Sequence, residues 1–141
     1  MPNNLITREK FIEFVRAAGM AVVATVDAEG NPEAALVEVA VTDDAEIVFD
    51  TKDTARKVAN IIGNPRTALV VGWNNGVSIQ VEGLASILSG AEREEYGRIY
   101  QSQFPGSRAL TEEFTIVRVA PRWLRYYDAR PESFHVVECH W

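Results

Sequence analysis

The segment from Met20 to Thr51 most constrains the fold, because it carries three runs rich in β-branched residues with only short polar stretches between them. The stretches AEGNP and TDDAE combine glycine, proline and acidic residues, which favour tight turns. Connections this short join antiparallel neighbours, since parallel strands need a crossover of about a dozen residues or more. We therefore expect two consecutive hairpins here.

The middle run of this segment predicts a strand with one fully apolar face. Every second residue from Ala35 to Val41 is alanine or valine, and this set alternates with Leu36, Glu38, Ala40 and Thr42. Successive side chains of a strand point to opposite faces, so one face can enter a core while the other is mixed. This pattern suits the wall of a barrel.

The second half of the chain predicts more strands of the same kind. Residues 66–73 form a fourth run, NNG suits a hairpin turn, and residues 77–88 form a long fifth strand in which Gly83 marks a bulge or bend. Residues 113–130 supply another pair of extended segments, interrupted at Pro121, which belongs at a strand edge or start. About six strands therefore make up an antiparallel barrel.

Short helices are predicted around these strands. Thr7 can cap a first helix that Gly19 ends, and residues 90–104 suit a surface helix. A further helix, stopped by Gly63, lies between the third and fourth strands, with an apolar stripe of Ala55, Val58, Ala59 and Ile62. The predicted fold class is mainly β, with peripheral α-helices.

Length and charge limit the classes of protein to which this chain can belong. Its 141 residues, 47% of them apolar, suit one domain over residues 1–141. A formal charge of −6 argues against nucleic-acid and anionic-membrane partners. The lone Cys139, an N-terminus without the apolar core of a signal peptide and the lack of a bilayer-length apolar run predict a cytoplasmic protein that does not span a membrane.

Two cations, Arg56 and Lys57, fall in the first turn of the predicted central helix, where the helix dipole disfavours positive charge by roughly 0.3–1 kcal/mol each. A bound phosphate would reverse that sign, and Lys52 lies a few residues upstream. The alternative is a solvated surface helix, because Asp53 in the same segment is a good N-cap. Taken alone, these residues leave both interpretations open, and a phosphate site at the turn between a strand and a helix is the one that bears on function.

The order of strand, hairpin and strand, followed by FDTKDTARKVANIIGNPRTALVVGW, resembles the pyridoxamine 5'-phosphate oxidase-like superfamily of flavin-binding split barrels. In that family a strand ending in an aromatic residue and threonine precedes a Ser-Arg-Lys helix start and an Asn-Pro-Arg turn. The matching positions here are Phe49 to Thr51, Ala55 to Lys57, and Asn64 to Arg66. The resemblance covers most of the chain and implies a six-stranded antiparallel split β-barrel that binds FMN at a homodimer interface.

The resemblance also implies a set of cofactor residues. Arg56 and Lys57 would grip the phosphate, with Thr51 and Lys52 as secondary ligands, and the flavin ring would lie along the backbone of residues 36–39. Ser78 falls at a family polar position, and Tyr127 falls where the oxidase has an aromatic residue. The full predicted set is Leu36, Val37, Glu38, Val39, Asp50, Thr51, Lys52, Arg56, Lys57, Ser78 and Tyr127.

Three departures from the family pattern concern ligand chemistry. Ala55 replaces the phosphate-contacting serine, and Asp50 replaces an aromatic or amide residue and adds a negative charge near the phosphate. The tail DARPESFHVVECHW lacks the Arg and His pair with which the oxidases hold their substrate's phosphate. We therefore do not predict vitamin B6 synthesis.

Other chemistry-bearing residues receive simpler interpretations. His135, Cys139 and His140 could ligate a metal or haem, but they lie in an extended terminal run that suits a packing strand. Aromatic residues in strands pack in the core more often than they stack on a cofactor ring. We therefore interpret four aromatic residues as core residues first: Trp73, Trp123, Tyr126 and Tyr127. No nucleophile elbow, dinucleotide fingerprint or zinc spacing is present.

The leading hypothesis is an FMN-dependent oxidoreductase with a small-molecule substrate, in which the flavin carries the redox chemistry and the protein supplies binding and orientation. The expected assembly is a C2 homodimer. A non-catalytic flavin or haem binding protein is the main alternative, because a fold does not guarantee turnover. A deazaflavin-dependent reductase is a further alternative.

Overall fold

The computed structural model describes residues 6–141. Residues 1–5, which begin both the predicted single domain and the N-terminus predicted to lack a signal peptide, lie outside the described residues. The division of the chain into one domain stays a prediction.

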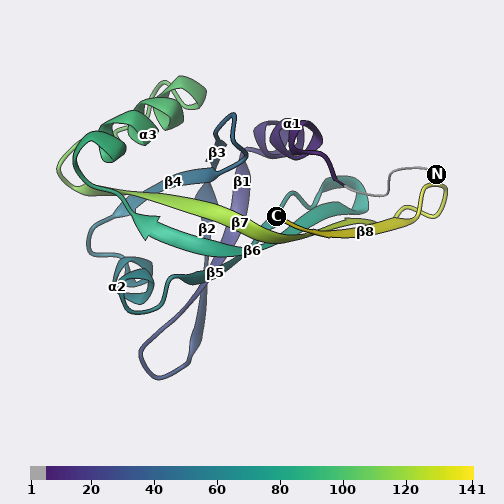
Figure 1. The fold of residues 1–141 in the computed structure, drawn as a ribbon, viewed down its shortest axis with the longest axis horizontal. Coiled ribbons are helices and arrows are strands. Elements are labelled where there is room, and N and C mark those ends of the chain that lie inside the picture. The colour runs from purple at the N-terminus through teal and green to yellow at the C-terminus, as the bar shows by residue number, and fades with distance from the viewer. Residues whose placement is uncertain (1–5) are drawn as a thin grey trace.

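Within residues 6–141, eight strands form one antiparallel sheet that curls into a half-barrel (Figure 1). Its order is β2-β1-β5-β6-β7-β4-β3, and β8 pairs with β7 beyond this path. The strands are β1 (Met20–Val26), β2 (Pro32–Glu38), β3 (Ala40–Val41), β4 (Ile47–Lys52), β5 (Arg66–Val71), β6 (Val77–Ile87), β7 (Phe114–Asp128) and β8 (His135–His140). The predicted mainly-β split barrel is confirmed.

Three helices and one short 3-10 turn surround the sheet in the described part of the chain: α1 (Arg8–Ala18), α2 (Arg56–Gly63), η1 (Asn74–Gly76) and α3 (Gly90–Gln103). As predicted, Thr7 caps α1, accepting a hydrogen bond from the Lys10 amide at 3.2 Å, and Gly19 ends it with φ +67°. Helix α1 places Phe11 and Val15 in the core. None of the helices in residues 6–141 is long and apolar enough to cross a membrane.

The predicted count of about six strands was too low. The first hairpin, β1–β2, is as expected, but the second is made by β3 and β4, because the run that starts in β2 breaks at Val39. Val39 is buried and its amide donates to the Gly19 carbonyl at 3.0 Å, and the next two residues, Ala40 and Val41, pair with β4 instead. The terminal run HVVECH adds β8, as its extended pattern suggested.

The expected interruption at Pro121 was wrong, because β7 runs through it. On one side of β7, β4 pairs only as far as Val119, and β8 starts only at Trp123. Pro121 therefore lies in the gap between β4 and β8 on this side of β7, and beside a bulge on the other side, which is where a sheet tolerates proline. On the other side, Glu82 pairs with Trp123 and Gly83 pairs with Pro121, which is the bulge expected at Gly83.

The apolar stripe predicted for α2 was also wrong. Ile62 is 71% exposed and Ala59 is exposed, whereas Asn60 and Ile61 are buried. The buried Asn60 is tolerated because its amide donates to Thr25 Oγ1 at 3.0 Å and to Glu33 Oε1 at 2.7 Å. A polar anchor, which hydrophobic periodicity does not detect, thus sets the rotation of this short helix.

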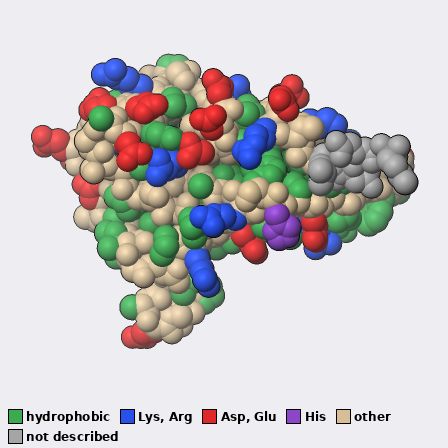
Figure 2. All heavy atoms as spheres, in the orientation of Figure 1, with side chains coloured by type: hydrophobic (Ala, Val, Ile, Leu, Met, Phe, Trp, Pro, Cys, Tyr) green, Lys and Arg blue, Asp and Glu red, His purple; other side chains and the backbone are tan. Residues whose placement is uncertain are grey.

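The main core cluster joins residues of α1 to residues of the sheet. The surface around α3 carries many charged side chains of both signs (Figure 2). Large, fully buried core side chains include Phe11, Val23, Phe49, Ile79 and Leu124. A second, smaller cluster under α3 joins Val48 and Ile116 to Tyr100. Helix α3 is therefore docked on the barrel rather than lying loosely on its surface.

The bulge makes Gly83 sensitive to substitution. A Cβ added at Gly83 would lie 2.5 Å from the Ala120 carbonyl oxygen, whereas a Cβ at Gly63 would have no atom within 4 Å. Gly83→Ala should therefore lower the free energy of unfolding by about 1–3 kcal/mol, as overpacking does. The matched control Gly63→Ala should leave it unchanged or slightly higher. Urea denaturation followed by circular dichroism measures both, and equal stabilities would contradict the close approach.

Candidate functional site

A cavity of about 720 Å³ opens between β2 and β4. These strands are not neighbours in the sheet, because β2 pairs only with β1 on the described ladder path while β4 pairs with β3 and β7. Helix α2 and the C-terminal end of α3 supply the remaining walls. The lining residues are Leu36, Val37, Glu38, Asp50, Thr51, Lys57, Tyr100, Gln103, Phe104, Pro105, Gly106, Ser107 and Arg108.

One end of this cavity is cationic. Lys57 Nζ donates to Thr51 Oγ1 at 3.1 Å, and burial lowers the pKa of Lys57. The N-cap of α2 is Ala55, which makes no side-chain cap, and the first turn holds no acidic residue. Asp53, which the alternative of a solvated surface helix expected as the N-cap, instead accepts a hydrogen bond from Thr115 Oγ1. An uncapped helix start beside a half-buried ammonium group is suited to an anion.

Arg56 points to a neighbouring hollow rather than into the main cavity. Its guanidinium makes a 2.9 Å ion pair with Glu33 of β2, and Glu33 also accepts from Asn60. Arg56, Glu33 and Lys57 line this hollow of about 70 Å³. The Arg56 side chain is 76% exposed, so it can exchange this partner without disturbing the core. Glu33 was not among the predicted site residues, because it is distant along the chain from the helix start that it contacts.

The opposite, α3 end of the cavity brings together Asp50 and Tyr100. Burial raises the pKa of Asp50, while a hydrogen bond with Tyr100 acts in the other direction. Burial also raises the pKa of Tyr100, and the negative charges of Asp50 and Glu38 add to this shift. Tyr100 is only 3% exposed, so it stays a neutral phenol across the physiological range.

Side-chain hydrogen bonds fix both ends of α3. The Gln103 side chain pairs with the Val41 backbone, donating to its carbonyl at 2.9 Å and accepting from its amide at 3.1 Å. The Arg93 guanidinium donates to three carbonyl oxygens of the following loop, those of Ala109, Thr111 and Phe114. These bonds therefore flank the loop of residues 104–108, which lines the cavity.

The wall formed by α3 was not predicted, because the charged run at Glu92 to Glu95 dominates the sequence of that helix. The signal was the spacing of Tyr96, Tyr100 and Phe104, which fall at i, i+4 and i+8 on one helical face. Tyr96 and Phe104 pack against the buried cluster around Tyr100. Their spacing therefore marked the face that docks on the barrel.

The structure brings Leu36, Val37, Glu38, Asp50, Thr51 and Lys57 of the predicted set to one cavity. Val39 is instead buried in the core, and Lys52 is exposed at the end of β4. Ser78 and Tyr127 face each other across β6 and β7, outside the cavity lining. The cofactor roles of the whole set stay predictions.

The residues considered for metal and stacking roles lie elsewhere. Cys139 is buried, while His135 and His140 are exposed in β8, which pairs with β7 as a packing strand. No group of three or more His, Cys, Asp or Glu side chains within residues 6–141 is arranged to hold a metal ion. Tyr126 packs edge-on to Phe14 and His135, and Tyr127 packs edge-on to Phe134.

Comparison with known proteins identifies relatives along most of the chain. The family model described as pyridoxamine 5'-phosphate oxidase matches residues 7–128. The pyridoxine/pyridoxamine 5'-phosphate oxidase of Bordetella pertussis is 38% identical over 86 residues, which are 60% of this chain and 40% of that protein. The chain thus spans about two fifths of the length of this curated relative.

Solved structures share the fold at low sequence identity. A heme binding protein from Mycobacterium smegmatis has a TM-score of 0.78 at 14% identity, over 96% of this chain and 59% of that one. An FMN binding protein related to pyridoxamine 5'-phosphate oxidase, from Nostoc punctiforme, has a TM-score of 0.68 at 16% identity, over 94% of this chain and 87% of that one. Both likenesses support the split-barrel architecture.

The half-buried Asp50 carboxyl predicts a stability cost at neutral pH. A carboxyl group whose folded pKa is raised destabilises the fold as pH rises from its ordinary value of 3.8 through the folded pKa. Asp50→Asn keeps a hydrogen-bond acceptor for Tyr100 and should raise the melting temperature at neutral pH, with the gain vanishing below pH 3.8. The control Asp44→Asn, at an exposed position, should change stability little. A lower melting temperature for Asp50→Asn would contradict this account.

Proposed function

Because the chain belongs to the pyridoxamine 5'-phosphate oxidase family, we propose that it binds FMN in the cavity between β2 and β4 and acts as an oxidoreductase on a small molecule. The observation that carries the proposal is Lys57, which stands in that cavity beside the uncapped start of α2. A volume of about 720 Å³ lies within the usual range of cofactor pockets.

The phosphate of FMN would bind at the cationic end. Lys57 supplies a charge whose burial strengthens its attraction to an anion, Thr51 supplies a hydroxyl, and the α2 backbone supplies free N–H groups. Arg56 could join them by leaving Glu33, because its side chain is largely exposed. Because Ala55 contributes no hydroxyl, Lys57 would supply a larger share of the free energy of phosphate binding than it would beside a serine.

The flavin ring would lie along the outer edge of β2. Leu36, Val37 and Glu38 line the cavity, and β2 has a ladder partner only on its β1 side in the described sheet. Its unpaired N–H and C=O groups can therefore meet the polar edge of a ring system. Bound FMN would supply the redox chemistry, and the protein would orient it and limit its contact with water. Turnover with NADH or NADPH would distinguish an enzyme from a carrier.

A homodimer belongs to the same proposal. Leu36, Val22 and Val70 share one row of the outer sheet face, and Leu36 is 55% exposed and Val70 39% exposed. Val70 pairs with Gln80, and Ser78 lies two residues before Gln80 in β6, so Ser78 is on the same face as Val70. Tyr127 pairs with Ser78 and shares this face. A two-fold axis through this face could bring Ser78 and Tyr127 of one copy to the cavity of the other.

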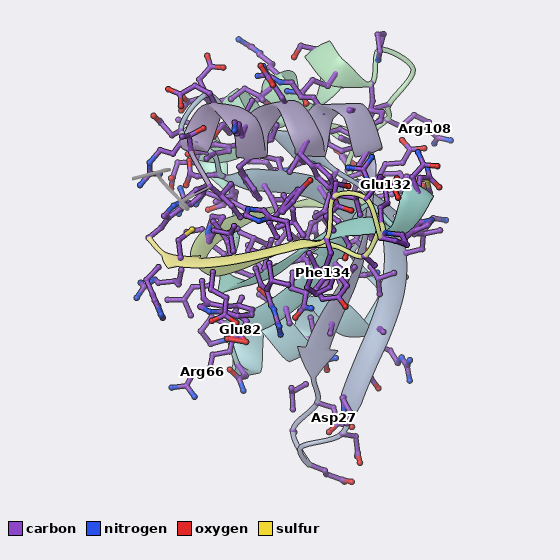
Figure 3. The ribbon with its side chains drawn as sticks, turned by 90° about the vertical axis from the view of Figure 1, so that its right-hand side faces the viewer. Asp27, Arg66, Glu82, Arg108, Glu132 and Phe134 are labelled. Atoms are coloured by element: carbon purple, nitrogen blue, oxygen red, sulfur yellow. The ribbon has the colours of Figure 1, made fainter. Side chains whose placement is uncertain are left out.

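The same outer face carries a groove of about 680 Å³. It is lined largely by small and apolar residues, including Ala24, Ala68, Leu84 and Trp123. Figure 3 shows Arg66 and Glu82, which also line this groove, near one another on the surface, with the β1–β2 hairpin and its Asp27 projecting beyond the barrel. This mixture of apolar area and charge suits a subunit interface.

Haem is the second candidate cofactor, because a heme binding protein shares the fold at a TM-score of 0.78. Histidine, cysteine, methionine and tyrosine are the usual axial ligands of haem iron. The cavity lining contains only the last of these, as Tyr100, and burial raises the pKa of Tyr100 and disfavours the phenolate that iron prefers. FMN is therefore the better fit, and a deazaflavin would use the same cationic end. A cytoplasmic location completes the proposal, in keeping with the lone cysteine.

FMN binding should depend far more on Lys57 than on Lys52. Lys57→Met removes a charge-assisted contact worth about 1.5–3 kcal/mol and should weaken FMN binding roughly ten- to hundredfold. Lys52→Met is the matched control at an exposed position and should have a much smaller effect. Quenching of FMN fluorescence on titration into flavin-free protein measures both variants. Wild-type affinity in Lys57→Met, or a Soret band in the purified protein, would contradict the proposal.

The proposed interface predicts a matched pair of surface variants. Val70→Lys places a charge on the outer sheet face and should convert a dimer to a monomer and weaken FMN binding, since the second copy's contribution is lost. Ile62→Lys places the same charge at an exposed apolar position on α2 and should leave the mass unchanged. Light scattering after size-exclusion chromatography gives the mass. A monomeric wild-type protein at micromolar concentration would contradict the interface.

A further inference from the structure

The α3 end of the cavity holds two carboxylates that make no ion pair within the described residues. Asp50 and Glu38 both line the cavity, and neither takes part in any of the ion pairs of residues 6–141. Asp50 is half-buried, under α3, where a lone negative charge is poorly solvated. Most exposed carboxylates of this acidic protein need no ion-pair partner, whereas the Asp50 carboxylate lies inside a cavity.

The groups around Asp50 leave its charge uncompensated. Tyr100 offers a hydrogen bond but no charge, because burial keeps its hydroxyl protonated. The Gln103 amide is already committed to the Val41 backbone. Lys57, the half-buried cation of the lining, makes its hydrogen bond to Thr51 at the α2 end. The side chains of Asp50 and Thr51 leave opposite faces of β4, which separates the two ends of the cavity.

Aromatic side chains complete this end. Tyr100 and Phe104 lie with ring centroids 4.9 Å apart and tilted by 32°, and both line the cavity. A carboxylate beside aromatic surface is an environment that binds organic cations, since the ring faces attract positive charge and cover apolar atoms. Arg108, the other cation of the lining, has a 72% exposed side chain at the periphery (Figure 3), about 4.0 Å from Glu113.

We propose that the α3 end of this cavity binds the cationic group of a small-molecule ligand, an ammonium or amidinium, with Asp50 as the residue that selects for positive charge. The proposal deepens the proposed function, on which it rests for the assignment of the α2 end to FMN, and it names the class of substrate that would lie beside the flavin. Glu38 adds a second negative charge at the edge of β2.

A set of three aromatic probes of similar shape tests the proposal: benzamidine, which is cationic, benzyl alcohol, which is neutral, and benzoate, which is anionic. Calorimetric titration into the FMN-loaded protein should show benzamidine binding at least roughly tenfold more tightly than benzoate, as charge-assisted bonds imply. Equal affinities, or a preference for benzoate through Arg108 or Lys57, would overturn the proposal. Repeating the probe titration with flavin-free protein shows whether the preference for the cation depends on FMN. The FMN assignment itself is tested independently by the fluorescence titration.

Three variants assign the preference to a residue. Asp50→Asn should reduce the benzamidine to benzoate ratio roughly tenfold, whereas Asp44→Asn, which removes an exposed charge, should leave it unchanged. Tyr100→Phe keeps the carboxylate and should keep most of the preference. A loss in Tyr100→Phe as large as in Asp50→Asn would assign the preference to cavity shape and overturn the role of charge. Should Asp50→Asn fail to fold, the wild-type ratio of the three probes decides the question.

Discussion

The absence of a hydrogen-bonded ladder between β2 and β4 is the constraint on which the rest of this structure depends. Val39 leaves the first hairpin with its amide bonded to Gly19, and the chain then crosses to pair with β4 through only two residues of β3. The barrel wall therefore stays open at this point. Backbone groups of β2 face the opening, and helices α2 and α3 close it from two sides with side chains of different charge.

The two ends of the cavity oppose one another electrostatically. At the α2 end, a half-buried lysine and an uncapped helix start favour an anion, while at the α3 end a half-buried aspartate and a neutral tyrosine favour a cation. Burial disfavours the charged form of the lysine, Lys57, and of the aspartate, Asp50. Such local costs are common where a site is prepared for a ligand that supplies the missing charge, and they are offset by the well-packed core elsewhere.

Polar anchors outside the cavity place these groups. Asn60 bonds to Thr25 and Glu33 and so fixes the rotation of α2, which directs Lys57 toward Thr51 and Arg56 toward Glu33. Gln103 copies the hydrogen-bond pattern of a neighbouring strand on Val41 and thereby fixes the end of α3. Two other predicted residues, Ser78 and Tyr127, face each other across β6 and β7, outside the cavity lining.

The sequence by itself determined the mainly-β architecture, the caps of α1, the bulge at Gly83 and the cationic start of α2, because each depends on residues adjacent or regularly spaced in the chain. It also placed Leu36 to Glu38, Asp50, Thr51 and Lys57 in one set. Only the tertiary structure decided the continuity of β7 through Pro121, the burial of Asn60, the pairing of Arg56 with Glu33 and the approach of Tyr100 to Asp50. These contacts join segments that are distant in the chain, and their energy arises from burial and charge in the assembled fold, which no local pattern of residues contains.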